Sequence, residues 1–110
     1  MDKDKAAQIR ALNDRFRQSG LGGTILHTNG VHALGAEIMN ELVTAIIGFD
    51  DFDSGNDPYG EHDFGAVTVE ENRVFWTIDY CGLDMVSGSP DPANPKITNR
   101  VMTIMLASEY

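Results

Sequence analysis

Hydrophobic side chains recur at helical spacing in two segments of the chain. Over residues 5–18, Ile9, Leu12 and Phe16 repeat at the spacing of one helix face. Over residues 36–48, apolar side chains form two adjacent rows, which together make a broad apolar face. These rows are Ile38, Leu42 and Ile46, and Met39, Val43 and Ile47. We predict a helix over each segment, with the second deeply packed in the core.

The first helix also carries charged side chains next to its apolar row. Arg15 and Arg17 fall beside Phe16, off the predicted stripe, and we expect both to face solvent. Gly20 and the pair at residues 22–23 follow, where such a helix would end.

Two segments have the pattern of β-strands. Residues 24–28 (TILHT) are short and rich in β-branched side chains, and Asn29-Gly30 after them is typical of a type I′ turn. Residues 64–81 alternate apolar and polar positions around a turn near residues 71–72, which predicts a hairpin. With a two-residue turn, paired positions sum to 143. The predicted core face is then Val67, Val69, Val74, Trp76, Ile78 and Tyr80.

The C-terminal segment fits two interpretations. Ile97, Val101 and Met105 form a helical row after Pro95, so we predict a helix over the last fifteen residues. Its many β-branched residues leave a buried strand as the alternative. The predicted fold class is α+β in one domain, residues 1–110, with a small antiparallel sheet packed against helices in the order α-β-α-β-β-α.

Charge is the most unusual property of the chain. Seventeen acidic residues stand against eight basic ones, which gives a net charge of −9. Between Arg17 and Arg73 there are ten acidic residues and no lysine or arginine. Such a chain does not coat DNA or RNA directly, because that function needs a basic surface.

The acidic residues concentrate in a long predicted loop, residues 49–63. Loops of this length inside a small domain are commonly functional. We therefore predict that the loop, with the neighbouring strand, forms the binding surface. Its predicted binding residues are Asp50, Asp51, Asp53, Asp57, Glu61, His62, Asp63 and Asp79.

Several classes of protein are disfavoured by what the sequence lacks. No apolar run is long enough to span a membrane, and the first residues do not have the apolar stretch of a signal peptide. The single cysteine, Cys81, cannot form an internal disulfide. We expect a cytoplasmic protein without a membrane partner. The motifs of P-loop nucleotide binding and of zincin chemistry are missing, and no cofactor is predicted.

One cluster could carry chemistry. The predicted register places His62 diagonal to Asp79, and a turn could bring Asp57 and Glu61 near, a ligand set suited to manganese, magnesium or calcium. We favour a structural interpretation, in which Asp57 caps a turn and His62 pairs with Asp79. The same register sets Cys81 opposite His62, a weaker case for a cysteine nucleophile. No catalytic residue and no metal ligand is therefore assigned.

Four segments of the chain resemble a known family. They are residues 56–65 (NDPYGEHDFG), 74–80 (VFWTIDY), 88–92 (GSPDP) and 103–110 (TIMLASEY). The chain resembles, over nearly its whole length, a bacterial family classed as domain of unknown function 3768. The resemblance implies a bacterial cytosolic protein of a kind often encoded near plasmid and other mobile-element genes, and it implies no activity. Members of that family tend to have tyrosine where this chain has Cys81.

These features together favour a non-enzymatic binding protein. Its expected partner is a basic protein, such as one that binds nucleic acid, held by the acidic surface. A concrete form is a mobile-element-encoded inhibitor of a host defence nuclease. The alternative function is a metal-dependent hydrolase using the cluster around His62, and a third is a structural or self-associating domain.

Overall fold

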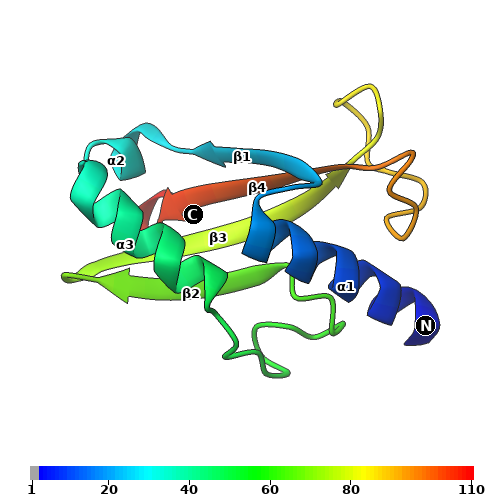
Figure 1. The fold of residues 1–110 in the computed structure, drawn as a ribbon, viewed down its shortest axis with the longest axis horizontal. Helices are drawn as coiled ribbons and strands as arrows, with labels where there is room; N and C mark the ends of the chain where they lie inside the picture. The colour runs from blue at the N-terminus through cyan, green and yellow to red at the C-terminus, as the bar shows by residue number, and fades with distance from the viewer. Residues whose placement is uncertain (1–2) are drawn as a thin grey trace.

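The computed structural model describes residues 3–110, which form an α+β fold with a four-stranded mixed sheet (Figure 1). The helices are α1 (Lys3–Ser19), α2 (Asn29–His32) and α3 (Ala36–Ile47). The strands are β1 (Gly23–His27), β2 (Phe64–Val69), β3 (Asn72–Cys81) and β4 (Asn99–Leu106), and a short 3-10 turn, η1 (Ala107–Glu109), follows. None of the helices in this part of the chain is long and apolar enough to cross a membrane.

The sheet has the strand order β1-β4-β3-β2. The three strands β2, β3 and β4 are antiparallel, but β1 runs parallel to β4. The prediction of a purely antiparallel sheet, and of the order α-β-α-β-β-α, is therefore wrong, while the α+β class is confirmed. The helices α1 and α3 lie over the same face of the sheet, as Figure 1 shows.

The C-terminal segment is a strand and not the predicted helix. Strand β4 lies between β1 and β3, and its consecutive residues Arg100, Val101 and Met102 are all buried. Both faces of β4 carry apolar side chains, Met102 and Ile104 on the face that the helices cover and Val101 and Met105 on the other, so the alternation of apolar and polar positions is weak. Its apolar pattern therefore resembles that of a buried helix, whereas its β-branched residues correctly indicated a strand.

Residues 29–30 do not form the type I′ turn that their sequence suggested. Asn29 begins the one-turn helix α2, because the Thr28 hydroxyl accepts a hydrogen bond from the Val31 amide and caps the turn. The buried Val31 then joins the core. A capping threonine thus outweighs the turn preference of Asn-Gly.

The predicted hairpin is present, with its register displaced by two residues. Gly65 pairs with Trp76, where the sequence suggested Val67 as the partner, and the turn falls at residues 70–71. A displacement by two leaves every side chain on its predicted face. Accordingly Val74, Trp76 and Ile78 are buried on the face that the helices cover.

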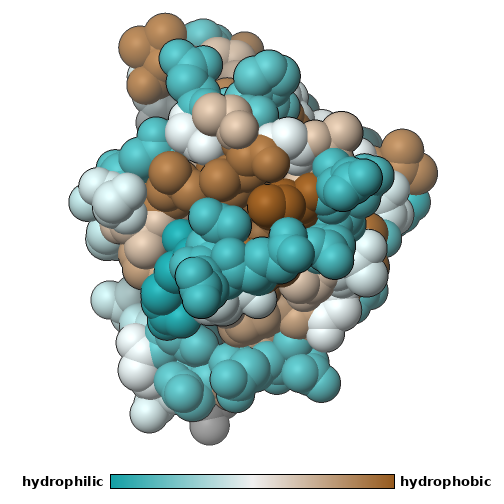
Figure 2. Space-filling model, turned by 90° about the vertical axis from the view of Figure 1, so that its left-hand side faces the viewer, coloured by the Kyte–Doolittle hydropathy of each residue, from teal (hydrophilic) through white to brown (hydrophobic). Residues whose placement is uncertain are grey.

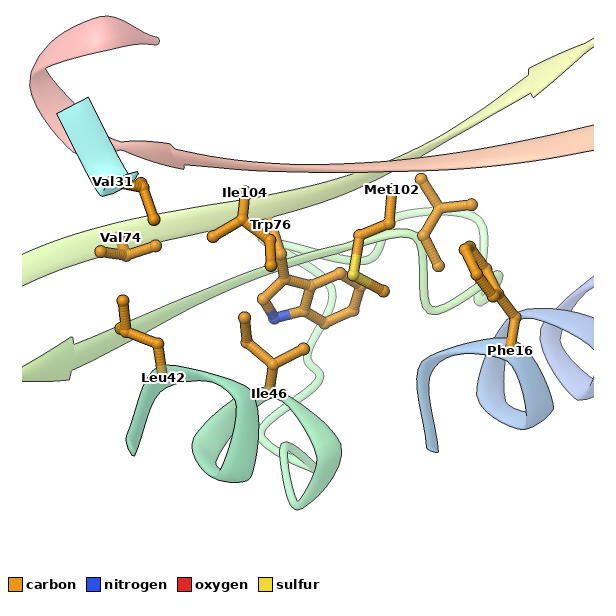
Figure 3. Packing of buried hydrophobic residues seen from close by; sticks show 9 residues of the cluster. Phe16, Val31, Leu42, Ile46, Val74, Trp76, Met102 and Ile104 are labelled. Atoms are coloured by element: carbon orange, nitrogen blue, oxygen red, sulfur yellow. The ribbon is translucent and has the colours of Figure 1, made fainter. Parts of the chain in front are cut away.

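The core lies between the helices and this face of the sheet (Figure 3). Phe16 enters it from α1, and Leu42 and Ile46 enter it from α3, all directed toward the strands. Trp76 is fully buried at the centre. Gly65 fits against the Trp76 ring so closely that an added Cβ would lie 2.5 Å from its Nε1 atom.

Candidate functional site

The acidic loop between α3 and β2 is held by its own side chains. The Asp53 carboxylate accepts hydrogen bonds from the amides of Gly55 and Asn56, at 2.8 and 3.0 Å. The side-chain oxygen of Asn56 accepts a hydrogen bond from the Asp53 amide, and its side-chain nitrogen donates one to the Asp51 carbonyl, both at 2.9 Å. The first half of the loop is therefore an ordered turn.

Asp57 orders the second half of the loop. It is only 8% exposed, and its carboxylate accepts from the amides of Glu61 and His62, at 2.9 and 3.1 Å. This confirms the prediction that Asp57 caps a turn. Its carboxylate is buried and bonded within the loop, so it is not available to contact a binding partner.

His62 points toward α1 and not toward Asp79. Its backbone has a φ of 55°, and its Nδ1 atom lies 2.8 Å from the Asp14 carboxylate. Its Nε2 atom lies 3.6 Å from Asp57, and its ring stacks on Phe52 with 3.7 Å between centroids. The predicted pair of His62 and Asp79 is therefore wrong, because the left-handed backbone turns the ring away from the hairpin.

Cys81 likewise departs from its predicted neighbour. It pairs in the sheet with Asn99 of β4, while His62 contacts α1. The proposed arrangement of Cys81, His62 and Asp79 is not formed, because both the register and the path of the chain at His62 differ from those predicted.

Arg17 connects α1 to the end of α3 and to the loop. It is only 4% exposed, whereas the sequence analysis expected it in solvent. One guanidinium nitrogen donates to the carbonyls of Ile46, Ile47 and Phe49, at 2.8 to 3.1 Å. The other donates to Asp14, the residue that holds His62. The last turn of α3 thus has its free carbonyls satisfied by a side chain from another helix.

A second polar cluster lies beneath the loop. The Tyr80 hydroxyl donates to the Glu61 carboxylate and accepts from the Asn13 amide, both at 2.8 Å. Arg100 donates to the Asn13 carbonyl oxygen at 2.8 Å. Burial raises the pKa of Tyr80 above its usual range, so the hydroxyl remains a donor even at alkaline pH. Glu61 is therefore also held by the fold.

The outer face of the sheet carries an acidic hollow of about 360 Å³. Its lining residues are Gly55, Asn56, Asp63, Phe64, Thr77, Ile78, Asp79 and Tyr110. Two carboxylates, from Asp63 and Asp79, share this hollow, and no lysine or arginine is among the lining residues. Phe64 and Tyr110 add aromatic surface, with 6.1 Å between their ring centroids.

Asp63 is the carboxylate of this pair whose negative charge is disfavoured by its surroundings. Its pKa is raised, first by burial and then by the negative charge of Glu61, with smaller contributions from Asp57 and Asp79. A cation entering the hollow would lie beside these acids and relieve their repulsion. The hollow is therefore suited to a positively charged group.

The predicted binding residues fall into separate groups. Asp50, Asp51 and Asp53 are exposed on the first half of the loop, while Asp57, Glu61 and His62 serve the internal contacts described above. Only Asp63 and Asp79 share the hollow. Within residues 3–110, no three histidine, cysteine or acidic side chains are grouped so that they could hold a metal ion.

The sequence analysis missed three residues of the internal network, Asn13, Arg17 and Arg100. Asn13 and Arg17 are four residues apart and lie at helical spacing from the buried Ile9 and Phe16. The position of these polar side chains on the apolar face of the helix could therefore have indicated that they are buried. Arg100 gave no comparable signal while its segment was interpreted as a helix.

Comparison with family models agrees with the motifs of this chain. The family model described as "Protein of unknown function (DUF3768)" matches residues 27–109, and the chain belongs to that family. The resemblance drawn from the four motifs is thus confirmed. Comparison with curated proteins and with solved structures finds no significant match.

Proposed function

We propose that this protein binds a basic protein partner, with the acidic hollow receiving a lysine or arginine side chain. The observation that carries the proposal is the convergence of Asp63 and Asp79 on a hollow that has an aromatic side and no basic lining residue. A carboxylate pair recognises the ammonium or guanidinium group, and an aromatic ring contacts its face. The exposed acids of the loop extend the same surface.

The distribution of basic residues supports the proposal. Arg17 and Arg100 are buried, and Arg10 donates to the Gly60 carbonyl at 2.9 Å. The positive charges of these side chains are used inside the fold or against its backbone, while Asp50, Asp51 and Asp79 are exposed. The acids around the hollow attract cations over a distance of about 10 Å at moderate salt, and the exposed Arg73, which lies over the Phe75 ring, is a basic side chain on the same face of the sheet.

The order of the loop also supports it. The loop is fixed by Asp53, Asn56 and Asp57, and by the stack of His62 on Phe52. A surface that is already ordered loses little conformational entropy on binding. We therefore assign the internal network a positioning role and the hollow the contact with the partner.

A defined peptide tests this proposal. A blocked tetra-arginine peptide, titrated into the protein and followed by amide NMR shifts, should perturb Asp63, Thr77 and Asp79. The double variant Asp63→Asn/Asp79→Asn should bind at least tenfold more weakly. The matched control, Glu37→Gln/Glu41→Gln, removes the same charge from the exposed side of α3 and should retain binding.

The outcome that contradicts the proposal is equally definite. Equal weakening in both double variants would mean that net charge alone attracts the peptide. Binding that does not weaken between low and high salt would also count against a charged contact.

The particular form that we propose is an inhibitor of a nucleic-acid-processing defence enzyme. Carboxylates would occupy positions where such an enzyme binds phosphates. Expression of the protein should raise plasmid transformation of a restriction-proficient bacterial host, and the Asp63→Asn/Asp79→Asn variant should not. Equal transformation with and without the protein would rule out this role in that host. The hydrolase alternative receives no support from geometry, because His62 and Asp79 lie apart.

A further inference from the structure

Strand β1 is an open edge of the sheet. All five of its residues are exposed, and Figure 1 shows no strand or helix on its outer side. The Thr28 amide donates to the Ile104 carbonyl at 3.0 Å, and a parallel strand bonds to its neighbour through alternate residues. By this alternation, Ile25 and His27 direct their amide and carbonyl groups away from β4. Such an edge is a template for another strand.

An apolar groove runs beside this edge. It has a volume of about 220 Å³ and lies between β1, the end of α1, and α3. Ile25, Val43 and Ile47 line it and are 45%, 40% and 42% exposed, and Leu26 is 51% exposed on the opposite face of β1. Figure 2 shows the end of the molecule that carries α2, where hydrophobic residues gather in a patch between hydrophilic ones. Large exposed apolar side chains around one edge are typical of a binding surface.

Charge distinguishes the two edges of the sheet. Residues 18–36 contain no aspartate, glutamate, lysine or arginine, in a chain whose net charge is −9, and the titratable side chains of this stretch are the stacked His27 and His32. A second copy of the chain is repelled wherever acidic surfaces meet, and this uncharged stretch is where repulsion is least. The other edge strand, β2, is flanked by Asp63 and by Glu70 and Glu71, so its antiparallel self-pairing would bring like charges together.

We propose that a second copy of this chain binds along β1, with the two β1 strands antiparallel about a two-fold axis at Ile25. Ile25 then pairs with its counterpart in the second copy, and Gly23 pairs with His27. Both residues of each pair carry the outward amide and carbonyl groups. The two sheets join into one continuous sheet, and the two apolar grooves meet across the axis.

The arrangement leaves the acidic hollow free. The hollow lies at the β2–β3 side of the sheet, and β1 is the opposite edge in the order β1-β4-β3-β2. Self-association through β1 is therefore independent of the proposed binding of a basic partner.

The test is the mass of the protein in solution across a range of concentrations. Sedimentation equilibrium should give twice the mass of one chain for the unaltered protein at high concentration, with dissociation on dilution. Ile25→Lys places a charge at the axis and should shift the protein to the mass of one chain. Val86→Lys adds the same charge on the loop after β3, outside the two strands that pair in the proposed dimer, where Val86 is 89% exposed, and should leave the dimer intact.

A second measurement covers the case in which Ile25→Lys fails to fold. In a Cys81→Ser background, Ile25→Cys should form a disulfide between two chains under mild oxidation, whereas Val86→Cys should not. A single-chain mass at every concentration overturns the proposal. So does a dimer that survives Ile25→Lys in a folded protein, or cross-linking that is equal at residues 25 and 86.

Discussion

The Arg17 guanidinium of α1 donates a hydrogen bond to the Ile46 carbonyl at the end of α3, across 2.8 Å. The two helices are thus joined by a buried charge that satisfies the last turn of α3, and the same side chain lies 5.4 Å from the centre of the Trp76 ring. This contact determines how α1 sits against the rest of the molecule.

Replacement of Arg17 should strongly destabilise the fold. Arg17→Met keeps most of the side-chain volume but leaves three carbonyls without their donor, and we expect a loss of about 3 kcal/mol in the free energy of unfolding. Urea unfolding followed by Trp76 fluorescence measures it. The exposed Arg15→Met should change the free energy by less than about 0.5 kcal/mol. Equal effects at the two positions would contradict the buried contact.

Gly65 should tolerate no side chain while Trp76 is present. The Cβ of Gly65→Ala would lie 2.5 Å from the Trp76 ring, and we expect a loss of about 1–3 kcal/mol. Gly48→Ala is the control, since its added Cβ would meet only the Thr44 carbonyl at 3.5 Å. In a Trp76→Phe background the cost at Gly65 should fall by more than about 0.5 kcal/mol. An unchanged cost would show that the ring is not the obstacle.

Asp63→Asn should stabilise the protein at neutral pH. The raised pKa of Asp63 means that the folded form binds a proton more tightly than the unfolded form, so the ionised carboxylate opposes folding. The penalty is complete above the folded pKa, decreases as pH falls through it, and is absent below the unfolded value of about 3.9. Urea unfolding at pH 7 and near pH 3.5 should show the gain only at pH 7.

Asp51→Asn provides the comparison for Asp63. Asp51 is exposed on the same loop, and its replacement should change the free energy of unfolding by less than about 0.5 kcal/mol. A gain for Asp63→Asn that is the same at both pH values would refute the electrostatic cause.

His62→Ala should loosen the acidic loop. The variant loses the stack on Phe52 and the contact with Asp14, and we expect a loss of about 1–2 kcal/mol. Hydrogen exchange at the Glu61 amide, which is bonded to Asp57, should become faster. His32→Ala, at an exposed position on α2, should leave that amide protected. Protection that persists in His62→Ala would mean that Asp57 orders the loop alone.

The sequence predicted the parts of the fold that depend on local pattern. Helix α3 and the two faces of the hairpin follow from periodicity. The predicted register of the hairpin was wrong by two residues, and Trp76 still lies on its predicted face because a displacement by two does not exchange the faces. Strand β4 could not be assigned in this way, since apolar side chains on both of its faces remove the alternation that distinguishes a strand.

The site was less predictable because it depends on contacts between distant residues. The acidic loop was recognised from composition, but the direction of His62 depends on one positive φ value and on Asp14, 48 residues earlier. The hollow joins the end of the loop to Thr77 and Asp79 of β3 and to Tyr110. No spacing in the sequence indicates that these three parts meet.

Helix α1 makes contacts that the region matched by the family model cannot make by itself. The family model begins at residue 27, yet Asn13, Phe16 and Arg17 provide partners for Tyr80, Arg100 and the end of α3. A fragment cut at that boundary would lose the donors of several buried acceptors and one wall of the core, and strand β4 would lose most of its neighbour β1. In this chain the matched region and the folding unit therefore have different starting points, and expression of the protein should include α1.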